Sequence, residues 1–455
     1  MVIEGCAVAT ADGAGTEYAD GHVVADGGVI TAVGAGPAPE MPGARRVDGR
    51  GCLATPGLVN THHHLYQWAT QGLAQDAELF DWLTALYPVW ARLDADAAHD
   101  AALSGLAWLA ASGTTTVADH AYLFPPGAGD LVAAEVAAAR RVGVRLHLCR
   151  GSMDLGTSAG GLPPDDLVED TDAALAATAA AVAAHHDPAP GAYVRVAVAP
   201  CSPFSASEPL MRGSADLARA TGTRLHTHFA EGRTEEAYCR ELTGTTLVGY
   251  LERLGWLGPD VWLAHAVHQD AATVGRLAAT GTGVAHCPTS NARLASGIAP
   301  VRALLDAGAP VGLGVDGSAS AEATTVRAEA HQAVLAARTR AAVGGEPAAA
   351  AALTAREALM LATIGGARCL GRDAELGSLE PGKLADVALW RVDGPGHAQI
   401  PDPVAALVLP PVAPPLELVL VGGHPVADAG GTTGVAPDEA VRAGARAART
   451  MREDR

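Results

Sequence analysis

Short apolar stretches alternate with longer alanine- and leucine-rich stretches through the middle of the chain. Strands that are buried on both faces are apolar along their length, and helices form the crossovers between parallel strands. Eight stretches fit such strands: 57–64, 114–120, 144–150, 194–201, 224–231, 261–267, 283–288 and 311–317. Eight strand–helix units in succession predict an α/β fold of the (β/α)8 TIM-barrel type.

The two ends of the chain have a different sequence pattern, of short strands separated by turns. Short strand-like runs separated by turns such as "ADG" and "DGG" fill the first 55 residues, and the same texture returns in "GSLEPGKLADVALWRV" and "LELVLVGGHPV". We expect a small β-sandwich built from both termini. The expected division is an N-terminal sandwich part at 1–55, the barrel at 56–371, a C-terminal sandwich part at 372–432, and a terminal helix or tail at 433–455.

Composition and charge narrow the class of protein. The 455 residues are 49% hydrophobic, which is enough for a large core, and the formal net charge of −19 disfavours nucleic acid as a partner. No signal peptide or membrane span is predicted, and seven cysteines without a CxxC pair favour a reducing cytoplasm. We expect a cytoplasmic, non-membrane protein that forms a homo-oligomer, since large barrels of this sort often associate through their helices.

Polar residues follow the apolar runs of nearly every predicted strand. In a (β/α)8 barrel the carboxyl ends of the strands form the active-site rim, so these residues are expected to meet there. The ones that carry chemistry are His62 and His64, His226 and His228, Glu231, His265, His286 and Asp316.

The three consecutive histidines of "NTHHHLYQ" cannot all face one way. Side chains alternate across a strand, so His62 and His64 share a face and His63 faces the opposite side. Imidazole nitrogens with one carboxylate around a rim suit zinc or iron(II) with a coordination position left open for water. We therefore expect one divalent metal ion, zinc in the first place and iron(II) as the alternative.

These motifs together resemble the amidohydrolase superfamily. The markers are "PGLVNTHHH", "HTHFAE", "LAHAV", "HCPTSN" and "GLGVDGSAS" at successive strands, and "GSLEPGKLADVAL" near the end of the chain. The resemblance implies that His62, His64, His228 and Asp316 are metal ligands, that His265 contacts the water at the metal, and that Glu231 is the proton shuttle. Members with two metals commonly bridge them with a carbamylated lysine. Here the single lysine, Lys383, lies outside the barrel, which favours one ion.

Closer matches concern the substrate. "THHHLYQ", "DAELFDWLTALYPVW", "GGLPPDDLVE", "APCSPFS" and "NARLASGIAPVR" look like the 8-oxoguanine deaminase group. The resemblance implies hydrolytic deamination of an aminated heterocycle, 8-oxoguanine to urate and ammonia in the first place, with isocytosine as a lesser substrate. Gln67, Cys201 and Ser202 are expected to line the substrate pocket, although Gln67 is equally well explained by a structural role and Cys201 is better explained by one.

Two other interpretations remain open at this point. A triazine amino- or chlorohydrolase of the same superfamily shares the framework, and the stretch "AEATT" after Ser320 departs from the usual pattern beside the active site. A non-catalytic barrel scaffold would be expected to lack a metal ligand or the acid/base pair. Both are present in this chain, which argues against the scaffold.

Overall fold

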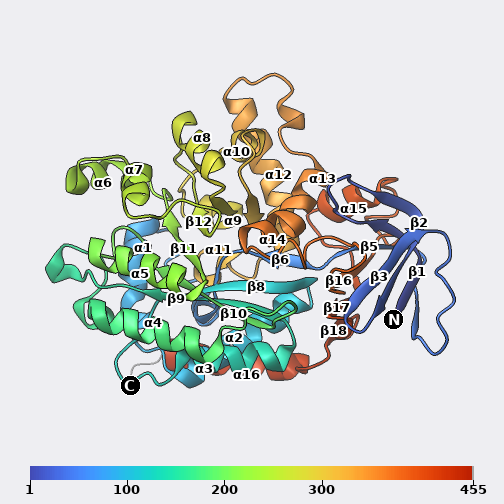
Figure 1. The fold of residues 1–455 in the computed structure, drawn as a ribbon, viewed down its shortest axis with the longest axis horizontal. Coiled ribbons are helices and arrows are strands. Elements are labelled where there is room, and N and C mark those ends of the chain that lie inside the picture. The colour runs from blue at the N-terminus through green and yellow to red at the C-terminus, as the bar shows by residue number, and fades with distance from the viewer. Residues whose placement is uncertain (453–455) are drawn as a thin grey trace.

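Eight parallel strands form a closed barrel at the centre of the protein (Figure 1). The computed structural model describes residues 1–452, and the strands follow one another around the barrel in the order β10-β11-β12-β13-β14-β6-β8-β9. The barrel strands are β6 (Leu58–Asn60), β8 (Thr114–Ala121), β9 (Arg145–Ser152), β10 (Val194–Pro200), β11 (Arg224–Phe229), β12 (Val261–His265), β13 (Gly283–His286) and β14 (Val311–Leu313). The predicted barrel is confirmed.

Helices surround the barrel and connect its strands (Figure 1). They are α1 (Leu79–Trp90), α2 (Ala95–Ala110), α3 (Leu131–Val142), α4 (Thr171–His185), α5 (Glu208–Thr221), α6 (Glu235–Thr243), α7 (Leu247–Arg253), α8 (Ala271–Thr280), α9 (Pro288–Arg293), α10 (Val301–Asp306), α11 (Ser318–Ala321), α12 (Val326–Val343), α13 (Ala355–Met360) and α14 (Gly366–Cys369). Short helical turns add Leu65–Thr70, Thr157–Ala159, Asp165–Leu167, Ala349–Ala351 and the π-helical Leu361–Gly365.

Local sequence signals set where the barrel helices begin and end. The Asp170 side chain accepts the N–H groups of Asp172 and Ala173 at the start of α4, and Ser207 accepts the N–H of Leu210 at the start of α5. Helix α5 ends at Gly222, whose φ of 70° is in the left-handed region that glycine adopts without steric cost. Such caps keep the connections compact and hold the strand ends in place.

The first barrel strand is shorter than predicted. It ends at Asn60, whose Oδ1 accepts the backbone N–H groups of Val315 at 3.0 Å and His62 at 3.4 Å, so these groups do not continue the ladder. Pairing resumes in a separate two-stranded ladder, in which β7 (His63–His64) runs parallel to β15 (Asp316–Gly317). This ladder joins the histidine run to the end of the eighth strand.

A second sheet of nine strands is built from both ends of the chain and lies at one end of the molecule (Figure 1). Its strands are β1 (Val2–Ala9), β2 (Glu17–Asp26), β3 (Val29–Ala35), β4 (Arg46–Asp48), β5 (Cys52–Pro56), β16 (Val387–Arg391), β17 (Leu416–Val421), β18 (His424–Asp428) and β19 (Gly431–Thr432). A buried bidentate ion pair between Arg145 and Asp386 connects this sheet to barrel strand β9, with N–O distances of 2.8 and 3.1 Å.

After the sheet and the short helix α15 (Pro403–Val408), the chain returns to the barrel. Helix α16 (Pro437–Arg452) packs along α2, and Arg446 donates two hydrogen bonds to Asp100, at 2.7 and 2.8 Å. All seven cysteines are buried free thiols. Within residues 1–452, no helix combines the length and apolar character that a membrane crossing requires.

Candidate active site

A cavity of about 650 Å³, including its mouth, opens at the carboxyl ends of the barrel strands. It is lined by eight of the nine site residues expected from the sequence: His64, Gln67, Cys201, Ser202, His228, Glu231, His265 and Asp316. The ninth, His62, is fully buried beside them, with its ring centre 4.7 Å from that of His64. Residues from five separate barrel strands or the loops after them therefore meet at one place.

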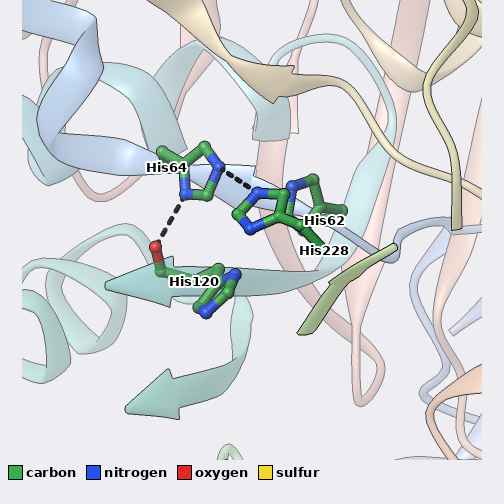
Figure 2. Close-up of side chains that lie close together, drawn as sticks. All are labelled: His62, His64, His120 and His228. Atoms are coloured by element: carbon green, nitrogen blue, oxygen red, sulfur yellow. Dashed lines mark hydrogen bonds between the residues drawn. The ribbon is translucent and has the colours of Figure 1, made fainter. Parts of the chain in front are cut away.

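Three imidazole nitrogens and one carboxylate oxygen form a tight group in this cavity. Asp316 Oδ1 lies 3.3 Å from His62 Nε2 and 3.2 Å from His64 Nε2. The Nε2 atoms of His64 and His228 are 3.2 Å apart (Figure 2). Ligands at about 2.0–2.1 Å from a tetrahedral zinc ion are separated by roughly 3.4 Å. The three separations are close to this value.

Backbone carbonyls orient two of these rings. His64 Nδ1 donates to the carbonyl of His120 at 2.7 Å (Figure 2), and His228 Nδ1 donates to the carbonyl of Cys201 at 2.6 Å. A neutral imidazole carries only one N–H, so each Nε2 is left with a lone pair. Metal-binding histidines are typically held by such a bond from their other nitrogen.

The third ring is oriented by another histidine. His226 Nδ1 donates to the carbonyl of Trp262 at 2.9 Å, which leaves its Nε2 as an acceptor for His62 Nδ1 at 2.7 Å. His62 Nε2 then bears a lone pair, is fully buried, and has no hydrogen-bond donor among residues 1–452. A buried polar atom without a partner is costly, and a cation at this position would satisfy it.

Burial also favours the metal-binding protonation states. Desolvation lowers the pKa of both His62 and His228 well below the usual range, so these rings are neutral near pH 7. Burial by itself raises the pKa of Asp316, but the adjoining imidazole groups of His62 and His64 outweigh it and lower that pKa well below its ordinary value. Neutral imidazoles and an ionised carboxylate are the forms that bind a divalent ion.

Glu231 lines the same cavity and differs from Asp316 in its protonation. Burial, together with the charge of Asp316, raises the pKa of Glu231 to about 8, so the carboxyl group can hold a proton near neutral pH. Its Oε2 is 3.5 Å from His265 Nε2, which in turn is 3.8 Å from Asp316 Oδ2. A proton donor and an ionised acceptor thus flank one histidine, as acid–base chemistry requires.

The backbone is strained where these residues sit. His265 and Asp316 have φ values of 70° and 61°, and Ala230, next to Glu231, has a φ of 49°. Residues other than glycine rarely adopt this region, and such strain tends to gather at functional sites. The strain accompanies the placement of the acid–base groups at the rim.

The remaining walls of the cavity are mainly apolar and include Leu79, Trp82, Leu83, Tyr122 and Leu294. Against this background Gln67 offers an Oε1 that is buried and has no hydrogen-bond donor in the described part of the chain. His63 does not join the group, since its Nδ1 accepts the backbone N–H of His64 at 2.7 Å. The alternation expected for the histidine run therefore agrees with the observed separation of His63 from the cluster.

Several residues of the site were not identified from the sequence. Glu235 accepts the backbone N–H groups of Glu231 and Gly232 through one oxygen, and Ser320 lines the cavity beside Asp316. His120 contributes its carbonyl to His64, and its ring stacks on His228 with centres 4.9 Å apart. His120 ends the second predicted barrel strand, so its position was a signal that could have revealed it.

The chain is similar to known proteins over nearly its full length. The model of the amidohydrolase family matches residues 53–426. The 8-oxoguanine deaminase of Pseudomonas aeruginosa is 45% identical over 90% of each chain, and the hydroxydechloroatrazine ethylaminohydrolase of Pseudomonas sp. is 37% identical over 84% of this chain and 80% of its own. The structure of the atrazine chlorohydrolase of Arthrobacter aurescens TC1, complexed with zinc, superposes with a TM-score of 0.92 at 34% identity, covering 98% of this chain and 99% of its own.

Proposed function

The chain belongs to the amidohydrolase family, and on this premise we propose that it removes the 2-amino group of 8-oxoguanine by hydrolysis, giving urate and ammonia. It is a hydrolase of heterocycles, as its deaminase and triazine-hydrolase relatives are. The observation that carries the choice of substrate is its similarity to an 8-oxoguanine deaminase over nine-tenths of both chains. Isocytosine presents the same amidine-like carbon and is the proposed lesser substrate.

In this proposal His62, His64, His228 and Asp316 hold one divalent ion. Their spacing and the free lone pairs of the three rings support this assignment, and zinc is the proposed ion, with iron(II) as the alternative. When bound, the ion supplies Lewis acidity that makes a water molecule a nucleophile near neutral pH.

The carboxylates move the protons. Asp316, which is ionised, accepts a proton from the attacking water, and the oxygen of that water forms a bond to the amino-bearing carbon. Glu231, which holds a proton because burial raises its pKa to about 8, gives that proton to the neighbouring ring nitrogen. The hydroxyl group of the tetrahedral centre then gives its proton to Glu231 and becomes the carbonyl, while the carbon–nitrogen bond to the amino group breaks and the amine takes up the proton held by Asp316, directly or through Glu231, and leaves as ammonia. His265 Nε2, between the two carboxylates, stabilises the tetrahedral centre.

The rest of the cavity positions the ring and excludes bulk water. Trp82, Leu83 and Tyr122 supply flat or apolar surface for a heteroaromatic ring, and the unpartnered Gln67 Oε1 can accept a ring N–H. Cys201 and Ser202 line the wall at the end of β10. A polar group of the pocket that is left unpaired by the wrong ring is costly, so each such group weighs heavily in the choice between substrates.

A triazine hydrolase is the second candidate, favoured by the close superposition on an atrazine chlorohydrolase. The acid–base pair and the metal donors serve either reaction, so they do not distinguish the two. Residues 321–325, which follow Ser320 at the cavity, are where the sequence departs from the common pattern. A non-catalytic scaffold is disfavoured, because the donor set and the acid–base pair are intact.

Product analysis tests the proposal. The metal-loaded enzyme incubated with 8-oxoguanine should release urate and ammonia in equal amounts, and the metal-stripped enzyme should release neither until metal is restored. Metal-loaded enzyme that forms no urate from 8-oxoguanine would contradict the proposed function.

A further inference from the structure

Asn291 holds His265 from the side opposite the cavity. Its Oδ1 accepts a hydrogen bond from His265 Nδ1 at 2.9 Å, and both side chains are almost completely buried. Asn291 lies in α9, just after the seventh barrel strand, whereas His265 ends the sixth. The contact therefore joins two neighbouring strand ends directly behind the acid–base group.

We propose that Asn291 is a positioning residue that retains the proton on His265 Nδ1 and keeps His265 Nε2 directed at Glu231 and Asp316. The inference rests on the proposed function, because it assigns a role within the same site. Within residues 1–452, the Asn291 amide oxygen accepts a hydrogen bond from His265 and from no other donor. The backbone conformation at His265, with a φ of 70°, sets the direction in which the side chain leaves the main chain. The hydrogen bond to Asn291 then sets the orientation of the ring.

The direction of this bond decides which nitrogen of His265 faces the substrate with a lone pair. With Nδ1–H donated to Asn291, proton exchange at the rim is confined to Nε2, which lies 3.5 Å from Glu231 Oε2 and 3.8 Å from Asp316 Oδ2. Without the acceptor, Nδ1–H would be buried and unsatisfied, and the ring would favour the other tautomer or rotate. The chemical step would then slow, whereas substrate binding would be little affected.

The main chain around Asn291 allows its side chain to be changed without rebuilding the loop. Its backbone N–H donates to the carbonyl of Cys287 at 3.0 Å, and its carbonyl accepts the N–H groups of Ser296 and Gly297 at 2.9 and 3.4 Å. None of these bonds uses the amide side chain. A substitution of similar size therefore tests the bond to His265 more than the shape of the loop.

The experiment compares Asn291→Leu, which has no acceptor, with Asn291→Asp, which keeps an acceptor oxygen at the same position. In the metal-loaded enzymes with 8-oxoguanine, Asn291→Leu should lower kcat by about 100-fold or more, while KM changes by less than about threefold and bound metal per chain is unchanged. Asn291→Asp should recover kcat to within about tenfold of the parent enzyme. Full activity of Asn291→Leu would overturn the proposal. So would equal loss in both variants, since it would mean that the amide N–H group and not the oxygen is needed.

A spectroscopic measurement keeps the proposal testable whatever the variants do. Nitrogen NMR of the ¹⁵N-histidine-labelled, metal-loaded protein should show His265 protonated at Nδ1, and assignment can use His265→Asn. An Nδ1 without a proton would overturn the inference even if the variants failed to fold. Absence of deaminase activity in the parent enzyme would instead count against the proposed function, and the NMR result would remain informative about Asn291.

Discussion

Nε2 of His64 and Nε2 of His228 lie 3.2 Å apart with their lone pairs facing each other. Neither nitrogen can donate to the other in a neutral ring, because each ring already donates from Nδ1 to a backbone carbonyl. Two lone pairs at this distance repel unless a cation or proton lies between them. The arrangement of these rings is thus one that an ion would stabilise.

Removing one of these rings should remove the metal. His228→Ala should bind much less than one zinc per chain after dialysis, because one of four donors is lost. His424→Ala, an exposed histidine on the outer sheet, is the matched control and should keep the parent's metal content. Elemental analysis of the purified proteins provides the measurement. Stoichiometric, tightly held metal in His228→Ala would show that the ligand set is wrong.

The histidine behind His62 should affect metal affinity without touching the metal. His226→Phe keeps a ring next to Trp262 but removes the acceptor for His62 Nδ1–H. We expect metal affinity to fall about 10- to 100-fold, the usual effect of losing such an outer partner. Competition with a fluorescent chelator measures it. An unchanged dissociation constant would mean that His62 is oriented adequately by its backbone alone.

The proton shuttle should be separable from metal binding. Glu231→Gln should retain the metal and lower kcat by about 100- to 10,000-fold, because the amide cannot transfer the proton that the carboxyl group holds. Glu241→Gln, an exposed position on α6, is the control and should behave like the parent. Steady-state ammonia release measures both. Near-normal turnover in Glu231→Gln would exclude the assigned mechanism.

A buried pair of carboxyl groups lies beneath the site. Asp119 Oδ1 accepts the backbone N–H of Leu65 at 2.6 Å, next to His64, and the Asp119 side chain also contacts Glu135 of α3. Desolvation, followed by the charge of Asp119, raises the pKa of Glu135 well above its ordinary value. Glu135 is therefore protonated in the folded protein at pH values where it is ionised in the unfolded chain.

This pair predicts a pH dependence of stability. A carboxyl group whose folded pKa is raised loses stabilising effect as pH rises from its unfolded pKa toward its folded one, here from about pH 4.5 upward. Relative to Glu135→Gln, the free energy of unfolding of the parent should fall by about 1.4 kcal/mol per pH unit above that point. Chemical denaturation of both proteins between pH 5 and 8 tests it. Parallel curves would show that Glu135 does not carry the extra proton.

The fold was largely predictable because its signals are local. Eight apolar strands, each followed by a helix, specify the barrel, and the polar residues at the strand ends specify where the site lies. His228 and Glu231 could be placed together for the same reason, since His228 lies near the end of one strand and Glu231 lies in the loop that follows it. The limits of the first strand were less predictable, because they depend on the Asn60 side chain, which bonds to a residue far away in the sequence.

The contacts behind the site could not be predicted in this way. The acceptors for His62, His64 and His265 come from different strands or loops, and nothing in the sequence pairs each acceptor with its ring. Which carbonyl or amide lies within hydrogen-bonding distance of a ring depends on barrel register and on loop geometry. The sequence predicted which residues would bind the metal, and the three-dimensional structure shows how their rings are oriented.

The most direct test of the account is the substrate preference of the metal-loaded enzyme. Ammonia or amine release from 8-oxoguanine, isocytosine, guanine, cytosine and hydroxyatrazine should be compared as kcat/KM under the same conditions. The account predicts the highest value for 8-oxoguanine, a lower one for isocytosine, and little or no turnover of hydroxyatrazine. A clear preference for hydroxyatrazine, or no turnover of 8-oxoguanine by an enzyme that holds its metal, would contradict it.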